Sequence, residues 1–257
     1  MAPAGSPVGG VVLVHGLGDH VERYREVAAV FAARGFQVGG VDLPGHGASP
    51  GARGRVEGAE AVETVIHESV ARLGELLGQG ARLGVAAHSM GAFFVLRLLQ
   101  QEPDLFEFAW LSSPLVRPGE HRSRVVREIL RVAARFFPGL TVSSKIRPEL
   151  CRRRRGEDDD DALIHHRVSL SLGAALLDME EAVARGVSAM NPLLALLVTH
   201  GEEDQICPAR YSRELFDAMN LENKRYLLLP DHMHEPFRDE GSEEVLAAVG
   251  RWLDGLG

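Results

Sequence analysis

Short, continuous apolar segments alternate with longer segments of helical periodicity along this chain. The continuous apolar segments, typical of strands buried on both faces, cover residues 11–14, 36–41, 83–87, 108–111, 193–198 and 226–229. Between them, apolar side chains recur at helical spacing over residues 22–34, 59–77, 91–101, 211–219 and 242–253. Because strands and helices alternate, we predict an α/β fold with a mostly parallel central sheet that carries helices on both faces.

Residues 114–190 interrupt this alternation. They contain helical patterns but no convincing strand, and they lie between two predicted strands of the sheet. An insertion of this size predicts a helical cap, or lid, over one end of the sheet. We therefore divide the chain into an α/β core of residues 1–113 and 191–257 and a cap of residues 114–190.

The predicted cap is strongly basic over part of its length. Residues 121–155 contain eleven Lys and Arg residues against two acidic residues. Arginines lie along one side of a helical pattern and apolar residues along the other: Arg124, Arg127, Arg131 and Arg135 against Val126, Ile129, Leu130, Ala133, Phe136 and Phe137. Two interpretations stay open. Either a basic amphipathic helix makes transient contact with an anionic membrane surface, or the arginines form a solvated face and pair with residues 157–161.

Composition excludes several classes of protein. With 257 residues, 45% of them hydrophobic and 25% charged, the chain can build a complete core. A net charge of -8 lacks the basic excess of nucleic-acid-binding proteins, so we expect no nucleic-acid partner. Two cysteines do not imply a disulfide framework. The sequence has no apolar run near the roughly 18 residues of a membrane span and no signal-peptide pattern, so we expect a cytoplasmic protein.

The segment around Ser89 has the sequence context of a catalytic nucleophile. Ala87-His88-Ser89-Met90-Gly91 follows a predicted strand and opens a predicted helix. A sharp turn between strand and helix exposes a serine hydroxyl, and small residues flank the serine because the turn brings backbones close together. Ala87 stands where this motif usually has glycine. A serine that begins a helix is also a common N-cap, so the assignment depends on the other motifs.

Main-chain N–H groups that could form an oxyanion hole are predicted at two places. Acyl transfer builds negative charge on the substrate oxygen, and each N–H group aimed at that oxygen contributes about 10²–10³ in rate. One such donor usually follows the nucleophile, and the other lies in the loop after an early strand. These positions correspond to Met90 and to Leu17, which lies in His15-Gly16-Leu17-Gly18-Asp19-His20.

Two further loops supply an acid and a histidine. Glu202, Glu203 and Asp204 follow the penultimate predicted strand and compete for the role of the acid. His232 and His234 both lie in the loop after the last predicted strand. The order along the chain, serine, then acid, then histidine, is that of the triad in α/β-hydrolases. Because the carboxyl ends of parallel strands meet at one edge of a sheet, we expect these loops to lie together.

Segments spread over most of the core match one known group of enzymes: residues 12–20, 23–24, 33–36, 42–49, 51–54, 88–91, 112–114, 201–204 and 234–235. On these segments the chain resembles the monoacylglycerol lipase and lysophospholipase group of α/β-hydrolases, also called serine aminopeptidase-like. The cap matches the group poorly, apart from residues 161–165. Because the cap determines the choice of substrate, the resemblance predicts the reaction better than the substrate.

The resemblance implies a role for each of the candidate catalytic residues. It identifies Ser89 as the nucleophile, Asp204 as the acid and His234 as the base. His234 is preferred to His232 because the family places a glutamate directly after the catalytic histidine. The oxyanion hole would consist of the main-chain N–H groups of Leu17 and Met90.

Other residues near the motifs are interpreted as structural. Asp42, His46 and Arg53 match family positions of this kind. His165 and His166 are expected on the cap surface, and Cys207 is expected to be a small buried residue. Ten residues precede the first predicted strand, so we expect the antiparallel N-terminal strands of the family to be shortened or missing.

These observations predict a serine hydrolase that cleaves carboxylic esters, either monoacylglycerols or lysophospholipid-like lipids, through an acyl-enzyme and without a cofactor. Its expected partner is a small-molecule ester or lipid. The alternatives with the same triad are a short-chain carboxylesterase and an aminopeptidase, which would need an acidic anchor such as residues 157–161. A metal-dependent hydrolase that uses His232 and His234, and a non-catalytic receptor on the same fold, are further alternatives.

Overall fold

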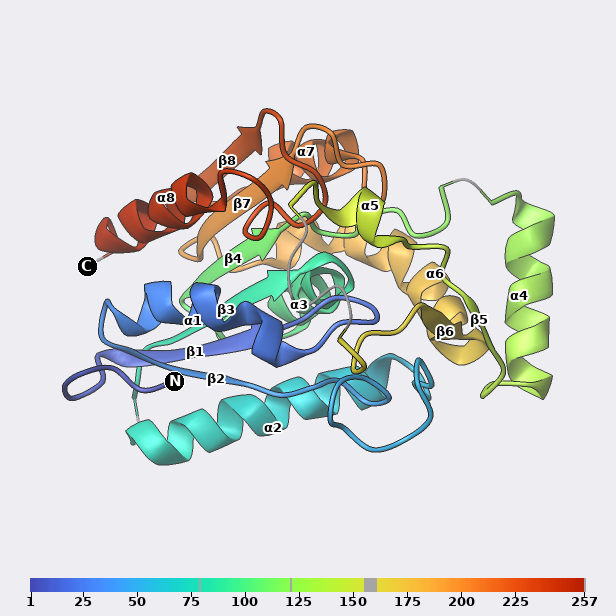
Figure 1. The fold of residues 1–257 in the computed structure, drawn as a ribbon, viewed down its shortest axis with the longest axis horizontal. Coiled ribbons are helices and arrows are strands. Elements are labelled where there is room, and N and C mark those ends of the chain that lie inside the picture. The colour runs from blue at the N-terminus through green and yellow to red at the C-terminus, as the bar shows by residue number, and fades with distance from the viewer. Residues whose placement is uncertain (79, 121, 155–160, 257) are drawn as a thin grey trace.

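The computed structural model describes residues 1–78, 80–120, 122–154 and 161–256 (Figure 1). At its centre lies a six-stranded sheet in the order β2-β1-β3-β4-β7-β8, and every pairing between these strands is parallel. The strands are β1 Gly9–Val14, β2 Phe36–Gly40, β3 Leu83–His88, β4 Phe108–Ser112, β7 Ala195–Gly201 and β8 Asn223–Leu229. The predicted parallel sheet is confirmed.

Helices connect the strands and cover both faces of the sheet (Figure 1). One face carries α1 Arg25–Ala32, which the 3-10 turn η1 Val21–Tyr24 precedes, together with α8 Ser242–Asp254. The other face carries α2 Ala59–Leu77, α3 Ser89–Gln101 and α7 Ala209–Ala218. None of the helices in the described ranges combines the length and the apolar character needed to cross a bilayer.

Alternate side chains of the strands belong to two separate hydrophobic cores. Along β1, Val12 and Val14 pack with α2 and α3, whereas Val11 and Leu13 pack with α1 and α8. All four side chains are buried. Because both faces are covered, neither face needs polar residues, and the strands are therefore visible in the sequence as continuous apolar runs.

The chain between β4 and β7 forms the insertion. Its elements are α4 Arg124–Phe136, β5 Thr141–Ser143, α5 Pro148–Cys151, β6 Arg167–Ser169, α6 Leu170–Arg185 and the 3-10 turn η3 Gly186–Ala189. The prediction that this segment lacks strands is wrong, because β5 and β6 pair in antiparallel orientation. Three residues per strand are too few to produce the period of two by which a strand is identified in sequence. α6 packs against both α4 and α3, and so joins the insertion to the core.

Helix α4, at the outer edge of the molecule in Figure 1, exposes its apolar side, whereas two of its arginines are partly covered by α6. Arg127 and Arg131 reach α6, where they pair with Glu180 at 3.1 Å and Asp178 at 2.6 Å. The pairing of the arginines with residues 157–161 stays a prediction, because residues 157–160 lie outside the described ranges.

Candidate active site

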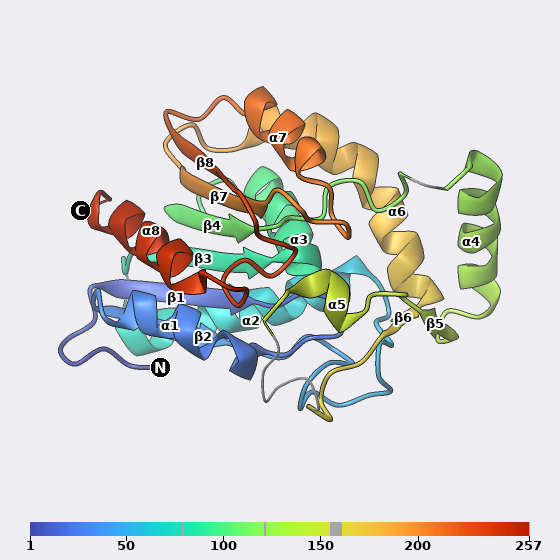
Figure 2. The ribbon, with the colours of Figure 1, turned by 45° about the horizontal axis from the view of Figure 1, so that its top comes forward.

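Four loops meet at the carboxyl edge of the sheet. They follow β1, β3, β7 and β8, and they carry residues 15–20, Ser89, Asp204 and His234. Parallel strands all end at this edge, so loops that are far apart in sequence become neighbours there. Helix α5 of the insertion lies beside the same edge (Figure 2), and Cys151 at its end lines one pocket together with Ser89.

Ser89 lies on a strained turn between β3 and α3. Its backbone φ is 52°, in the left-handed region that disfavours side chains other than glycine. Close packing holds the turn, since a Cβ atom built on Gly91 would lie 2.4 Å from the carbonyl oxygen of His15. Glycine is therefore required at this position. Ala87 precedes the turn, inside β3, and its methyl group is buried in the core under α2 and α3, which explains why alanine is accepted there.

The structure brings Ser89, His234 and Asp204 into one chain of hydrogen bonds. Oγ of Ser89 lies 2.9 Å from Nε2 of His234, and Nδ1 of His234 lies 2.7 Å from Oδ2 of Asp204. A carboxylate only accepts hydrogen bonds, so Nδ1 carries the imidazole hydrogen and Nε2 accepts from the Ser89 hydroxyl. All three side chains are buried. This arrangement can activate a serine as a nucleophile.

The other candidates for the acid and the histidine lie apart from the hydrogen-bonded series Ser89–His234–Asp204. Glu202 and Glu203 are exposed, and Glu203 pairs with Arg153 of the insertion. Nδ1 of His232 lies 2.7 Å from the carbonyl oxygen of Pro230. His232 and His234 therefore have different partners and do not converge as a metal-binding pair, and no group of three or more potential ligands is found among the residues that the structure describes.

Opposing effects act on the pKa values of Asp204 and His234. Burial by itself would raise the pKa of Asp204, but the charge of His234 and the hydrogen bonds from His200 and His234 hold it well below its usual range. Burial by itself would lower the pKa of His234, but Asp204 outweighs burial and raises it above the ordinary value of 6.5. At neutral pH Asp204 is thus ionised and stabilises an imidazolium on His234.

The two predicted oxyanion donors lie beside Ser89. Met90 is the second residue of α3, where main-chain N–H groups have no partner inside the helix and the helix dipole is positive. Leu17 lines the same pocket as Ser89. Its neighbour Gly16 packs closely on Ser89, since a Cβ atom at Gly16 would lie 3.2 Å from Cβ of Ser89. The part that the N–H groups of Leu17 and Met90 play in a reaction stays a prediction.

The loop after β1 is fixed by its own histidine and aspartate. Nδ1 of His15 lies 2.8 Å from the carbonyl oxygen of Gly16, while Nε2 accepts a main-chain N–H of the loop after β2 at 2.9 Å. Asp19 accepts from Arg23 at 2.6 Å and from the Tyr24 hydroxyl at 2.9 Å. These bonds give a loop with several glycines one defined conformation.

The insertion docks on this loop. The main-chain N–H of His165 donates to the carbonyl oxygen of Gly18 at 3.0 Å, and Nε2 of His20 lies 2.7 Å from Oδ2 of Asp161. His165 and His166 both line the pocket that contains Ser89. The expectation that these two histidines form part of the cap surface is therefore wrong for His165, which is buried, whereas His166 is exposed as expected. Their contacts depend on segments distant in sequence, which a local pattern cannot reveal.

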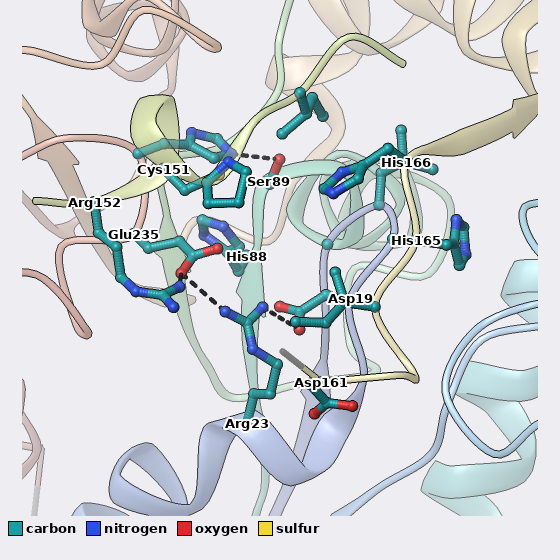
Figure 3. Close-up of a pocket in the computed structure, with 17 residues that line it drawn as sticks. Asp19, Arg23, His88, Ser89, Cys151, Arg152, Asp161, His165, His166 and Glu235 are labelled. Atoms are coloured by element: carbon teal, nitrogen blue, oxygen red, sulfur yellow. Dashed lines mark hydrogen bonds and ion pairs between the residues drawn. The ribbon is translucent and has the colours of Figure 1, made fainter. Parts of the chain in front are cut away.

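The pocket between core and insertion has a volume of about 310 Å³. It is lined by glycine, charged and imidazole groups as well as a few apolar side chains: Gly16, Leu17, Gly18, Asp19, Arg23, His88, Ser89, Ile146, Pro148, Cys151, Arg152, Asp161, Ile164, His165, His166, His234 and Glu235. Figure 3 shows several of these side chains around Ser89. The wall is unusually polar for a buried small-molecule site.

Four charged side chains form a buried network in this wall (Figure 3). Arg23 bridges Asp19 and Glu235, at 2.6 and 3.3 Å, and Arg152 lies 2.7 Å from the same oxygen of Glu235. The two arginines hold the pKa of Glu235 below its usual value, against burial. The sequence indicated Glu235 only as the family's glutamate after the histidine, and Arg152 was one of four consecutive arginines with nothing to distinguish it.

Both cysteines are buried and unpaired. Burial raises the pKa of the Cys207 thiol well above its ordinary value, and it raises that of Cys151 as well. A thiol that stays protonated is a weak nucleophile. Cys207 is therefore the small buried residue that the sequence indicated.

Comparison with known proteins identifies the family. The family model described as "Serine aminopeptidase, S33" matches residues 5–241. A monoacylglycerol lipase of Mycolicibacterium smegmatis is 28% identical over 264 residues, which cover 98% of this chain and 90% of the relative. The crystal structure of a Paleococcus ferrophilus monoacylglycerol lipase has a TM-score of 0.86 and 31% identity, covering 97% of this chain and 95% of the other.

A more distant structure has the same fold. A soluble variant of monoglyceride lipase from Saccharomyces cerevisiae, solved with a substrate analog, has a TM-score of 0.80 at 17% identity and covers 99% of this chain and 89% of its own. At that identity the likeness shows the fold alone. The family match over residues 5–241 and the 31% identity to the Paleococcus ferrophilus lipase lead to one conclusion: the chain belongs to the serine aminopeptidase S33 family of α/β-hydrolases and to its monoacylglycerol lipase-like group.

Proposed function

We propose that this protein hydrolyses the ester bond of a monoacylglycerol, or of a lysophospholipid, with Ser89 as nucleophile, His234 as general base and Asp204 as the acid that orients it. The observation that carries the proposal is the unbroken chain of hydrogen bonds through these three side chains. The chain is a carboxylic ester hydrolase, so the proposal concerns which residues perform the reaction and which ester is cleaved.

In the proposed reaction, Nε2 of His234 accepts the hydroxyl proton of Ser89 while Oγ attacks the ester carbonyl. The N–H groups of Leu17 and Met90 stabilise the oxyanion. When the tetrahedral intermediate collapses, His234 gives its proton to the leaving alcohol and the acyl group stays on Ser89. Water then attacks the acyl-enzyme with His234 again as base, which releases the carboxylic acid. Asp204 fixes the imidazole tautomer and stabilises its cation throughout.

The charged network in the pocket wall favours a neutral leaving group. Asp19, Arg23, Arg152 and Glu235 supply two negative and two positive charges, and each arginine lies against a carboxylate. A phosphate group would have to compete with these buried pairs, and breaking a buried pair is costly. The hydroxyl groups of glycerol can exchange hydrogen bonds without displacing a charge. We therefore favour monoacylglycerol over lysophospholipid.

A short-chain carboxylesterase is the second candidate, because the pocket is small. Its volume of about 310 Å³ lies near the lower end of the roughly 300–1,000 Å³ of small-molecule sites. Its apolar wall includes few large side chains, among them Ile146 and Ile164. An aminopeptidase has weaker support. Asp161, the described member of residues 157–161, lines the pocket but already accepts a hydrogen bond from His20.

We also infer that the insertion contacts a lipid surface mainly through the apolar side of α4. Val125, Ile129, Val132 and Phe136 are exposed along one side of this helix, and they border a shallow hollow whose lining is almost entirely apolar. Such a face inserts between lipid headgroups. Arg124, the first residue of α4, is also exposed and can meet lipid phosphates.

Hydrolysis of p-nitrophenyl esters of increasing acyl length tests the proposal, with Ser89→Ala as the blank. Each buried methylene contributes about 0.8 kcal/mol, so a step of two carbons in an apolar tunnel raises kcat/KM about tenfold. A rise toward medium or long chains supports the lipase, and a maximum at the shortest esters supports the short-chain esterase. Equal turnover by Ser89→Ala and the wild type would contradict the proposed triad.

The leaving group is tested with two substrates that carry the same acyl chain. Release of fatty acid from 1-monoacylglycerol is compared with release from lysophosphatidylcholine at equal concentration below micelle formation. We expect the higher kcat/KM for the monoacylglycerol. A preference for the lysophospholipid would contradict the interpretation of the charged network. Binding of either lipid without any turnover would support the non-catalytic receptor.

A further inference from the structure

His200 on β7 is a second imidazole at the acid of the triad. Its Nε2 lies 3.1 Å from Oδ2 of Asp204, the same oxygen that His234 contacts, and 2.6 Å from the carbonyl oxygen of Cys207. The side chain is completely buried. In the reaction described above it has no role.

The partners of His200 determine where its hydrogen lies. Nε2 faces a carboxylate and a carbonyl, and both only accept, so Nε2 must carry a hydrogen. In a neutral ring Nδ1 then accepts, and the hydroxyl of Ser212 on α7 lies 2.7 Å from it. Ser212 in turn lies 2.8 Å from the hydroxyl of Tyr226 on β8. The ring is therefore fixed from both sides, by the loop after β7 and by the hydroxyl groups of Ser212, which is buried, and Tyr226, which is half-buried.

Asp204 receives four hydrogen bonds. Oδ1 accepts the main-chain N–H groups of Ile206 and Cys207, both at 2.8 Å, and Oδ2 accepts from His200 and His234. Two of these four donors are backbone groups that hold the loop. His200 is therefore the side chain that shares Oδ2 with the proposed base.

We propose that His200 is a positioning residue, which holds the carboxylate of Asp204 in the orientation that His234 requires and compensates part of its negative charge. The proposal rests on the proposed function of the triad. A second donor on Oδ2 prevents the carboxylate from rotating away from His234. It also reduces the charge that His234 experiences, so His200 adjusts the strength of the base that accepts the Ser89 proton.

The test compares His200→Leu, which removes the donor, with His200→Gln, whose amide can donate from nearly the position of Nε2. For His200→Leu we expect kcat to fall about tenfold with KM within about twofold of the wild type, since one charge-assisted hydrogen bond is lost. Without the second donor, the negative charge of Asp204 acts more strongly on the imidazolium of His234. The acid limb of the kcat/KM profile should therefore move to higher pH, by about half a unit. His200→Gln should recover most of both effects.

A neighbouring residue on the same strand provides the matched control. Thr199→Val removes another buried hydrogen bond, from the indole of Trp110 at 3.0 Å, which does not involve Asp204. It should leave the acid limb in place. The other titratable groups around His234, namely His88, Glu235 and Asp19, are unchanged in every variant.

The proposal is overturned if the acid limb of His200→Leu coincides with that of the wild type, or if Thr199→Val moves it equally. Should His200→Leu fail to fold, His200→Met replaces it. This variant also removes the donor to Oδ2 of Asp204 and should move the limb in the same direction, and an unmoved limb there is equally decisive. If Ser89→Ala is as active as the wild type, the proposed function fails first; if Ser89→Ala is inactive and the limbs do not move, only the role of His200 fails.

Discussion

The core and the insertion use amphipathic elements in opposite ways. In the core, both faces of β1 are covered and Phe94 on α3 is completely buried. In the insertion, α4 pairs Arg127 and Arg131 with α6 and leaves Ile129 and Phe136 exposed at 60% and 73%. The comparison teaches that a hydrophobic pattern predicts which side of an element is apolar, but that burial depends on whether another element covers that side.

The two regions also supply different parts of the site. Every member of the proposed triad follows a core strand, at the edge where parallel strands end. The insertion lines the pocket and contacts the core loops. Arg152 forms an ion pair with Glu235, and the main-chain N–H of His165 donates to the carbonyl oxygen of Gly18. The core thus provides the groups that we propose to react, and the insertion shapes the pocket in front of them.

The largest effect is expected in the core, for Asp204→Asn. An asparagine fits the loop but favours the wrong tautomer of His234, so kcat should fall by about 10⁴-fold. Glu203→Gln, at the exposed neighbouring position, should keep kcat within about twofold. Initial rates with a p-nitrophenyl ester measure both variants. A loss below tenfold for Asp204→Asn would show that this residue is not the acid of the triad.

A smaller but still large effect is expected for Gly91→Ala, because a methyl group there meets the backbone of β1. The free energy of unfolding should fall by about 2–4 kcal/mol, since neither the helix nor the strand can move away cheaply. Gly74→Ala on α2 is the matched control. A Cβ atom there meets nothing within 4 Å, so stability should rise by up to about 1 kcal/mol. Urea denaturation followed by circular dichroism compares the two.

The pH dependence of catalysis should show the raised pKa of His234. The base must be neutral to accept the Ser89 proton, so kcat/KM should fall about tenfold per pH unit below that pKa. Because Asp204 raises this pKa above 6.5, the acid limb should lie above pH 6.5. A profile that stays flat down to about pH 5 would contradict the assignment of His234 as base.

The smallest effect on stability is expected in the insertion, for Phe136→Ala. This side chain is mostly exposed, so the free energy of unfolding should change by less than about 0.5 kcal/mol. Phe94→Ala, the matched change in the core, should cost about 3–5 kcal/mol. Phe136→Ala should nevertheless weaken binding to phospholipid vesicles, measured by flotation. Unchanged flotation after the further change Ile129→Asp would contradict the proposed lipid contact.

The sequence predicted the core well because each of its signals is local. The strands are continuous apolar runs, and Ser89 with Gly91 forms a motif within three residues. The structure of the insertion was predicted poorly because it depends on contacts between residues that are distant in sequence. Arg131 pairs with Asp178 on another helix, and Arg152 with Glu235 at the far end of the chain. No periodicity distinguishes the arginine that is buried in such a pair from one that is solvated.

The contact between Arg152 and Glu235 limits how the insertion can be exchanged between relatives. Glu235 directly follows His234, its carboxylate binds Arg152, and its main-chain N–H donates to the carbonyl oxygen of Cys151 at 2.8 Å. A chimera that lacks residues 151–152 would leave the peptide after His234 without two of its supports. Substrate range can therefore be altered by changing other insertion residues that line the pocket, such as Ile146 and Ile164, whereas this dipeptide has to be inherited together with the core.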